Sequence, residues 1–337
     1  LYDGAAELDA HPLLSLLARP NRRQAGAEFR EALCGHLLVA GNAYVEAVSF
    51  EETVRELHAL RPDRMKVVPG PDGWPEAYEY TVGGRTVRYA DPGEGTLSPI
   101  LQLSLFHPLN DHYGFAPIEA AQVALDVHNA AGAWNKALLD NSARPSGALV
   151  YQAKEGGNLS AEQFERLKAE LETSFIGAAH AGRPLLLEGG LDWKAMALSP
   201  KDMDFMEAKN GAAREIALAF GVPPMLLGIP GDNTYSNYKE ANLAFWRGTV
   251  LPLVARIAGS LSNWLAPAFD DGPGSPDQVG GRSGAGLRLS FDADQIDALA
   301  AEREAVWARV AAADFLTVDE KRAAVGYGPV AGGDRMG

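Results

Sequence analysis

One stretch decides how the rest of this chain is organised: Phe220-Gly221-Val222-Pro223-Pro224-Met225-Leu226-Leu227-Gly228. Apolar residues recur at helical spacing before it, and a Gly-, Pro- and Asn-rich segment follows it up to Asn237. Glycine tolerates positive φ and proline fixes φ near −65°, so both favour a turn. The sequence therefore predicts a helix, a polar loop and a second helix in succession.

The two flanking helices carry their own boundary signals. The first is expected at 199–220, because Ser199-Pro200-Lys201-Asp202 supplies a cap, a proline at the first helical position and an early acid. The second can be capped by Ser236 and continues to Phe269. About 30 residues at about 1.5 Å each give a length of about 45 Å. Pro252 lies inside this pattern, near Gly248, so we expect a kink there.

Composition bounds the class of protein. The chain has 337 residues, of which 47% are hydrophobic and 22% charged, as in a folded protein of two or three domains. The net charge of −14 disfavours adhesion to nucleic acid, which needs an excess of Lys and Arg, but does not exclude a protein that DNA slides past without sticking. With Cys34 as its single cysteine, the chain has no disulfide framework, and a reduced cytosolic origin is expected. No membrane span or signal peptide is visible.

The remaining patterns predict an α+β fold. Helices are expected within 1–20 and at 24–40, and short strands of a largely antiparallel sheet within 43–110, with a hairpin at Gly83-Gly84. An Ala-rich helix follows at 117–141. An insert at 142–198 contains a helix capped by Ser160 and Gln163, and a hairpin of 184–188 with 193–198. A strand at 287–291, a helix at 296–312 and a capping box at Thr317 complete the pattern.

Catalytic motifs are sparse. The sequence has no Walker-type phosphate loop, no nucleophile elbow and no His-Glu-x-x-His pattern. His107, Asp111 and His112 could be read as metal ligands, but they span a predicted turn in which such side chains commonly bond the backbone. A paired-carboxylate site could use Asp202, Asp204 and Glu207, although acids are also favoured in the first turn of any helix.

Three further residues can be interpreted either as functional or as ordinary members of the hydrophobic core. Cys34 lies on an apolar helix without an evident histidine partner, which favours a buried small hydrophobe over a reactive thiol. Trp246 and Trp264 could stack on a nucleic-acid base. Their helical spacing among Leu and Val favours a place in the core.

Taken together, these motifs resemble the portal proteins of HK97-type tailed phages, including those of prophages and gene transfer agents. The resemblance covers nearly the whole chain and is most specific at Phe220–Gly228 and Tyr235-Ser236-Asn237. The other matching motifs are Arg214-Glu215-Ile216-Ala217, Glu240, Asn42-Ala43-Tyr44, Leu60-Arg61-Pro62-Asp63-Arg64, His107, Gly114-Phe115-Ala116-Pro117 and Asn141-Ser142-Ala143-Arg144-Pro145-Ser146-Gly147.

This resemblance implies a portal fold with named regions. An α/β wing would comprise 1–113 with 237–295, including the long kinked helix. Stem helices would lie at 114–141 and 199–220, and a small α/β clip at 142–198. A tunnel loop would occupy 221–236, and a short helical crown 296–337. The loop at 270–286 has no assigned role.

The resemblance also implies a function without catalysis, cofactor or metal. The portal is a ring, usually of about twelve copies, at one capsid vertex, and double-stranded DNA enters and leaves through it. Its other partners would be the terminase, the major capsid protein and a head–tail adaptor, in a virion assembled in the bacterial cytoplasm. DNA-facing residues would be Asp232, Asn233, Thr234 and Tyr235, and residues packing between subunits would be Ala120, Ala124, Ala131, Trp246 and Pro252. The alternatives are a metal-dependent nuclease or hydrolase, or another capsid or adaptor protein.

Overall fold

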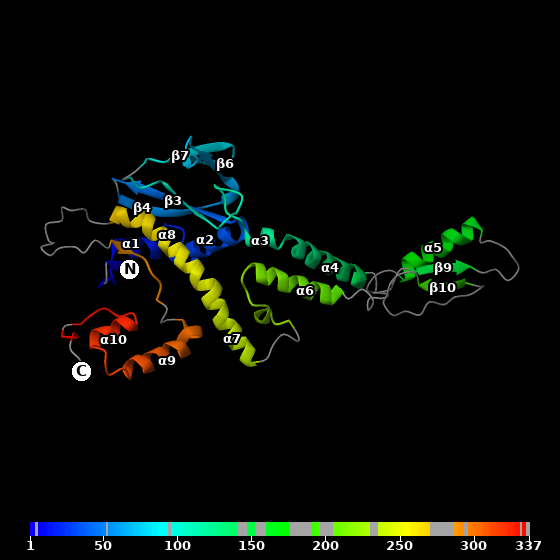
Figure 1. Ribbon diagram of the computed structural model, residues 1–337. Coiled ribbons are helices and arrows are strands. Elements are labelled where there is room, and N and C mark those ends of the chain that lie inside the picture. Colours follow the sequence, from blue (N-terminus) through cyan, green and yellow to red (C-terminus); the bar gives the residue numbers. More distant parts are fainter. Residues whose placement is uncertain are drawn as a thin grey trace. The chain divides into compact units, whose positions relative to one another are not determined.

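The computed structural model describes residues 1–3, 6–51, 53–93, 96–140, 147–151, 160–175, 191–195, 205–229, 235–269, 286–292, 296–330 and 332–334 (Figure 1). It divides into two compact units. Unit 1 contains Leu1–Ala120 and Ala219–Gly337, and unit 2 contains Ala121–Leu218. Unit 2 is thus inserted between the two parts of unit 1.

The core of unit 1 forms where helix α2 (Gly26–Ala40) packs on an antiparallel sheet of order β4-β3-β8. The strands are β3 (Asn42–Phe50), β4 (Thr53–Leu60) and β8 (Ile100–Ser104), and Tyr44 pairs with Leu60 on one side and Gln102 on the other. Phe29, Leu33 and Leu37 of α2 are fully buried against this sheet, as their spacing of four predicts.

A second antiparallel sheet of order β5-β6-β7 follows a short 3-10 turn, η1 (Pro62–Arg64). Its strands are β5 (Met65–Pro69), β6 (Pro75–Val82) and β7 (Arg85–Ala90). Gly83 and Gly84 form the predicted hairpin with φ of 56° and 78°, values that side chains with a Cβ rarely adopt. The mixed, largely antiparallel α+β composition is therefore confirmed.

The two chain segments of unit 1 meet in a third sheet, of order β11-β1-β2. Its strands are β1 (Tyr2–Asp3), β2 (Ala6–Glu7) and β11 (Leu287–Arg288), with Tyr2 opposite Arg288. The sequence predicts β11, although over a longer range, and misses β1 and β2. Helix α1 (Pro12–Ala18) follows, capped by His11 Nδ1, which accepts from the Leu13 amide at 3.2 Å.

The long helix begins one residue before the expected cap Ser236 and has three parts. They are α7 (Tyr235–Phe245), a π-helical turn η4 (Trp246–Val250) and α8 (Leu251–Phe269). Where a kink is expected, at Pro252, the structure has a π turn that ends two residues earlier, at Val250. Ile257, Leu261 and Leu265 of α8 complete the main core, and Pro267 is a second proline inside this helix.

The C-terminal segment contains η6 (Asp297–Leu299), α9 (Ala300–Ala311) and α10 (Val318–Ala324). The capping box predicted at Thr317 is present. The Glu320 amide donates to Thr317 Oγ1 at 3.2 Å, and the Thr317 amide donates to Glu320 Oε2 at 2.8 Å. Two of the amides that a helix N-terminus leaves unpaired are thus satisfied.

Unit 2 contains α4 (Gln122–Asp140), β9 (Gly147–Tyr151), α5 (Ala161–Phe175), β10 (Leu191–Ala195) and most of α6 (Phe205–Ala219). The expected single helix at 117–141 is instead two segments, because α3 (Pro117–Ala120) ends just before α4 begins. The box at Ser160 and Gln163 caps α5 as predicted. Strand β10 pairs antiparallel with β9, and the expected partner strand at 184–188 lies outside the described residues.

Candidate functional site

The stretch Phe220–Gly228 forms a tight turn that follows helix α6. Gly221 has a φ of 67° and Gly228 a φ of 72°, and between them η3 (Pro224–Leu227) makes one 3-10 turn. The Leu226 amide donates to the Pro223 carbonyl at 3.0 Å, and Ile229 is buried after the turn. Asp232, Asn233 and Thr234 lie outside the described residues, and Tyr235 is the first residue of α7.

This turn is attached to the π turn of the long helix through one side chain. Thr249 Oγ1 donates to the Gly221 carbonyl oxygen at 2.6 Å. A Cβ placed on Gly221 would lie 2.6 Å from the same Oγ1, so glycine is required for space as well as for its positive φ. The sequence does not single out Thr249, because nothing in a helical pattern marks a residue that bonds to a distant carbonyl.

A second constrained point lies where β8 leads into α3. Asn42 is 5% exposed; its Oδ1 accepts from the Gly114 amide at 2.9 Å and from Gln102 Nε2 at 3.2 Å. Its Nδ2 donates to the Ala40 carbonyl at 2.9 Å. A Cβ on Gly114 would overlap the Gly41 carbonyl oxygen, and one on Gly41 would overlap the Gly114 carbonyl. Asn42 and Gly114 belong to two of the motifs that carry the family resemblance. Their contacts hold the backbone at 41–42 against the backbone at 114, a place called the backbone crossing below.

Gln102 extends this crossing into a polar network between the two larger sheets. Its Nε2 also donates to the His112 carbonyl at 2.7 Å and to Tyr44 Oη at 3.2 Å, while Tyr78 Oη donates to its Oε1 at 3.3 Å. Burial raises the pKa of the Tyr44 phenol well above its usual value. Burial, and secondarily the charge of Asp91, raise the pKa of Tyr78 to about 12. These phenols are therefore neutral hydrogen-bonding groups at physiological pH.

The candidate metal ligands lie in a loop that bonds its own backbone. His107 Nδ1 accepts from the Leu109 amide at 3.0 Å, and its ring meets Phe115 edge-on at 5.4 Å. The His112 amide donates to Asn110 Oδ1 at 2.9 Å. Among the residues described, no group of three or more His, Cys, Asp or Glu side chains could hold a metal ion.

Only one of the three candidate carboxylates lies in a described part of the chain. Asp202 and Asp204 lie outside the described residues, while Glu207 is exposed in the first turn of α6. Cys34 is half-buried, and burial raises the pKa of its thiol, which Arg30 partly offsets. A raised thiol pKa disfavours the nucleophilic thiolate.

The residues predicted to pack between subunits occupy different environments. Ala120 and Pro252 are exposed and Trp246 is half-buried, whereas Ala124 and Ala131 are buried. The side chains of Ala120 and Pro252 are therefore open to solvent in the single chain.

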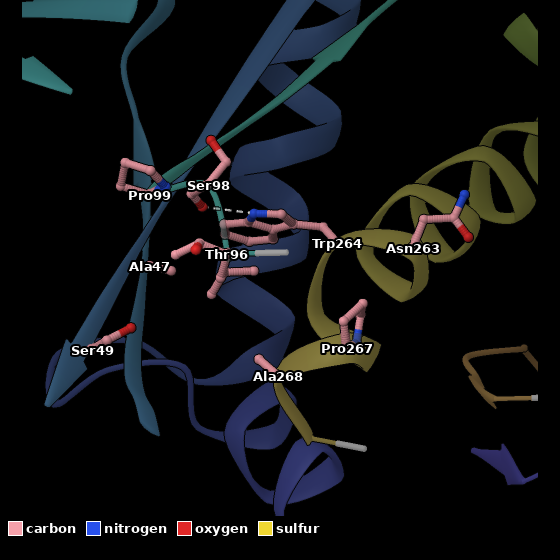
Figure 2. Close-up of a pocket in the computed structure, with 10 residues that line it drawn as sticks. Ala47, Ser49, Thr96, Ser98, Pro99, Asn263, Trp264, Pro267 and Ala268 are labelled. Atoms are coloured by element: carbon pink, nitrogen blue, oxygen red, sulfur yellow. Dashed lines mark hydrogen bonds between the residues drawn. The ribbon is translucent and has the colours of Figure 1, made fainter. Parts of the chain in front are cut away.

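A surface hollow adjoins the C-terminal end of α8 (Figure 2). The Trp264 indole lies across it, and its Nε1 donates to the Ser98 carbonyl at 2.8 Å. Trp264 also packs against the main core, as its helical spacing predicts. The described residues that line the hollow include no acid, base or nucleophilic cysteine, so it does not resemble a catalytic pocket.

The described site consists of hydrogen-bonded turns and a backbone contact that position helices and strands. The family model for phage portal proteins matches residues 1–326. The chain therefore belongs to the phage portal protein family, and the predicted family is confirmed.

Individual proteins agree with this assignment. A chain in the neck of a native gene transfer agent particle, computed with C12 symmetry, is 56% identical and has a TM-score of 0.71, covering 94% of this chain and 84% of that one. An uncharacterised Rickettsia bellii protein is 44% identical over 97% of this chain and 80% of its own length. The portal protein of Enterobacteria phage HK97 is 26% identical over 78% of this chain and 60% of its own length.

Proposed function

We propose that this chain is the subunit of a portal ring, the channel through which double-stranded DNA enters and leaves a phage-like particle. The observation that carries the proposal is the family match over residues 1–326, together with 56% identity to a chain in a neck computed with C12 symmetry. The expected ring thus contains twelve copies and sits in the virion, at one capsid vertex. Portal proteins are structural, and we assign the chain no catalytic role.

The charge of the chain suits a channel rather than a clamp. Twelve copies, each with a formal charge of −14, would surround the axis. A net negative charge around the axis disfavours tight ionic contacts with phosphate, and weak contacts would leave DNA free to move. The segment that would face the DNA, Asp232, Asn233, Thr234 and Tyr235, contains no cation that could hold a phosphate.

The division into units supports the proposed regions. Unit 2, Ala121–Leu218, leaves and re-enters unit 1 through α4 and α6, as expected of a clip carried on a two-helix stem. The Trp134 and Phe205 rings lie 5.3 Å apart, and Asn135 Nδ2 lies 3.6 Å from Met206 Sδ, so the two helices contact each other. The wing, tunnel loop and crown keep the boundaries given above, with terminase, major capsid protein and head–tail adaptor as proposed partners.

Electron microscopy of the purified protein, alone and with its capsid protein, tests the ring. Rings with an open axial channel are expected. A chain that remains monomeric under both conditions would contradict the proposal. Cleavage of DNA with Mg²⁺ or Mn²⁺ that is lost in Asp204→Ala would instead favour the nuclease alternative.

Shortening the loop by Gly231–Thr234 tests its proposed contact with DNA. Rings should still form, because the contacts of the turn lie at Gly221 and Thr249, outside the deletion. DNA packaging or retention should fall, as measured by DNA protected from nuclease per particle. A deletion of equal length within 270–285, which has no assigned role, is the control. Unchanged packaging after the loop deletion would remove the loop from the mechanism.

A further inference from the structure

The π turn at Trp246–Val250 has a cause in the sequence. In an unbroken α-helix, the ring of Pro252 would clash with the carbonyl of Gly248, and the i→i−4 hydrogen bond would be absent in any case. The structure widens the helix at that point, and the Leu251 amide bonds to the Trp246 carbonyl five residues earlier. A π turn of this kind inserts one extra residue into the helix, and such turns are frequent at functional sites.

The hydroxyl of Thr249 is used in an unusual way. Within a helix, a threonine hydroxyl commonly bonds to a carbonyl three or four residues earlier on its own helix. Thr249 Oγ1 instead donates to the Gly221 carbonyl, 28 residues away in sequence, at 2.6 Å. The closest atoms to a Cβ built on Gly221 all belong to Thr249, so the two residues are fitted to each other.

We propose that Thr249 is a positioning residue that ties the turn at 221–228 to the helical register of the π turn. This inference rests on the proposed portal function, in which that turn leads into the DNA-facing loop. If the π turn relaxed to an α-helix, α7 would rotate by about 100° and shift by about 1.5 Å relative to α8. The Thr249 hydroxyl would then leave Gly221. The register of the long helix and the position of the turn would change together.

A pair of substitutions isolates the hydroxyl. Thr249→Val keeps the branched shape and removes the donor, whereas Thr249→Ser keeps the donor. A hydrogen bond at an exposed site contributes about 0.5–1.5 kcal/mol, which corresponds to about 2- to 12-fold faster amide hydrogen exchange. We expect that increase at 221–229 in Thr249→Val, near-native exchange in Thr249→Ser, and unchanged exchange in β3 of both.

The helical register is tested separately with Pro252→Ala. This exposed substitution restores an amide and removes the clash, so an α register becomes accessible. Exchange at 221–229 should then increase with Thr249 intact, which keeps the proposal testable even if Thr249→Val does not fold. Native exchange in Pro252→Ala, or equal exchange in the Val and Ser variants, would overturn it.

The exchange measurements need only soluble protein, so they test the bond between Thr249 and the turn at 221–228 whether or not rings form. A wild-type protein that forms no rings would contradict the portal function and leave the exchange result standing. Where rings form, DNA retention should fall in Thr249→Val rings and stay native in Thr249→Ser rings. Equal retention would limit the role of Thr249 to local stability and overturn its part in positioning the loop.

Discussion

Replacing Asn42 with alanine removes a side chain on which the backbone crossing depends. The Gly114 amide loses its acceptor in a buried environment, and the bonds to Gln102 Nε2 and the Ala40 carbonyl are lost as well. An unsatisfied buried amide costs about 1–3 kcal/mol, and each ordinary hydrogen bond contributes about 0.5–1.5 kcal/mol. Gln102 Nε2 retains two other acceptors, Tyr44 Oη and the His112 carbonyl. We therefore expect the free energy of unfolding to fall by about 2–4 kcal/mol.

The assay has to report on unit 1 by itself, because the chain divides into two compact units and a protein of several domains need not unfold in one transition. Hydrogen exchange of β3 and β8 peptides in increasing urea provides this, at one fixed protein concentration so that assembly does not change the apparent stability. Asn263→Ala, an exposed amide on α8, is the matched control and should change stability by less than about 0.5 kcal/mol. A loss in Asn42→Ala as small as in this control would refute the reasoning, since it would mean that water replaces the Asn42 oxygen.

Two further predictions follow from buried polar contacts. Trp264→Phe removes the donor to the Ser98 carbonyl and should lower the free energy of unfolding by about 1–2 kcal/mol, measured by urea denaturation. The control is Trp74→Phe, at a 75% exposed site, which should change the free energy of unfolding by less than about 0.5 kcal/mol. Equal losses in the two variants would contradict the estimate for Trp264. Burial raises the pKa of Tyr78 to about 12, and burial followed by the bond to Glu46 raises the pKa of Tyr89 to about 12. Between about pH 10 and 12 these phenols therefore ionise in the unfolded chain but stay neutral in the folded one, so the free energy of unfolding should fall as the pH rises through this range. A phenolate absorbance titration of Tyr78→Phe against the wild type checks this, and ionisation of Tyr78 near pH 10 in the folded protein would contradict it.

Local signals were the most predictable part of the fold. The Gly83-Gly84 hairpin and the boxes at Ser160 and Thr317 each depend on residues within a few positions of one another, and the structure contains all three. Strands β1 and β2 were missed, because each is two residues long and their sheet includes a partner at the far end of the chain. No local periodicity carries that information.

The long helix shows a different limit. The apolar spacing predicts a continuous helix and Pro252 predicts a kink in it, but neither specifies that the backbone adjusts by a π turn. The bond from Thr249 to Gly221 cannot be predicted from a local pattern, because the two residues belong to different elements. Conversely, Asn42 and Gly114 belong to motifs that carry the family resemblance, but the motifs alone give no physical reason for these two residues. The reason is a contact between two backbones, which only the structure provides.

The pairing of β1 with β11 also governs when the protein can be completed. Arg288, the partner of Tyr2, is synthesised only after the whole of the intervening chain. At about 5–20 residues per second, roughly 15–60 s separate the two. Unit 2 is one continuous stretch, Ala121–Leu218, and is synthesised entirely within that interval. A chain cut short before residue 287 lacks β11, so β1 keeps β2 as its partner in this sheet but loses the strand on its other side.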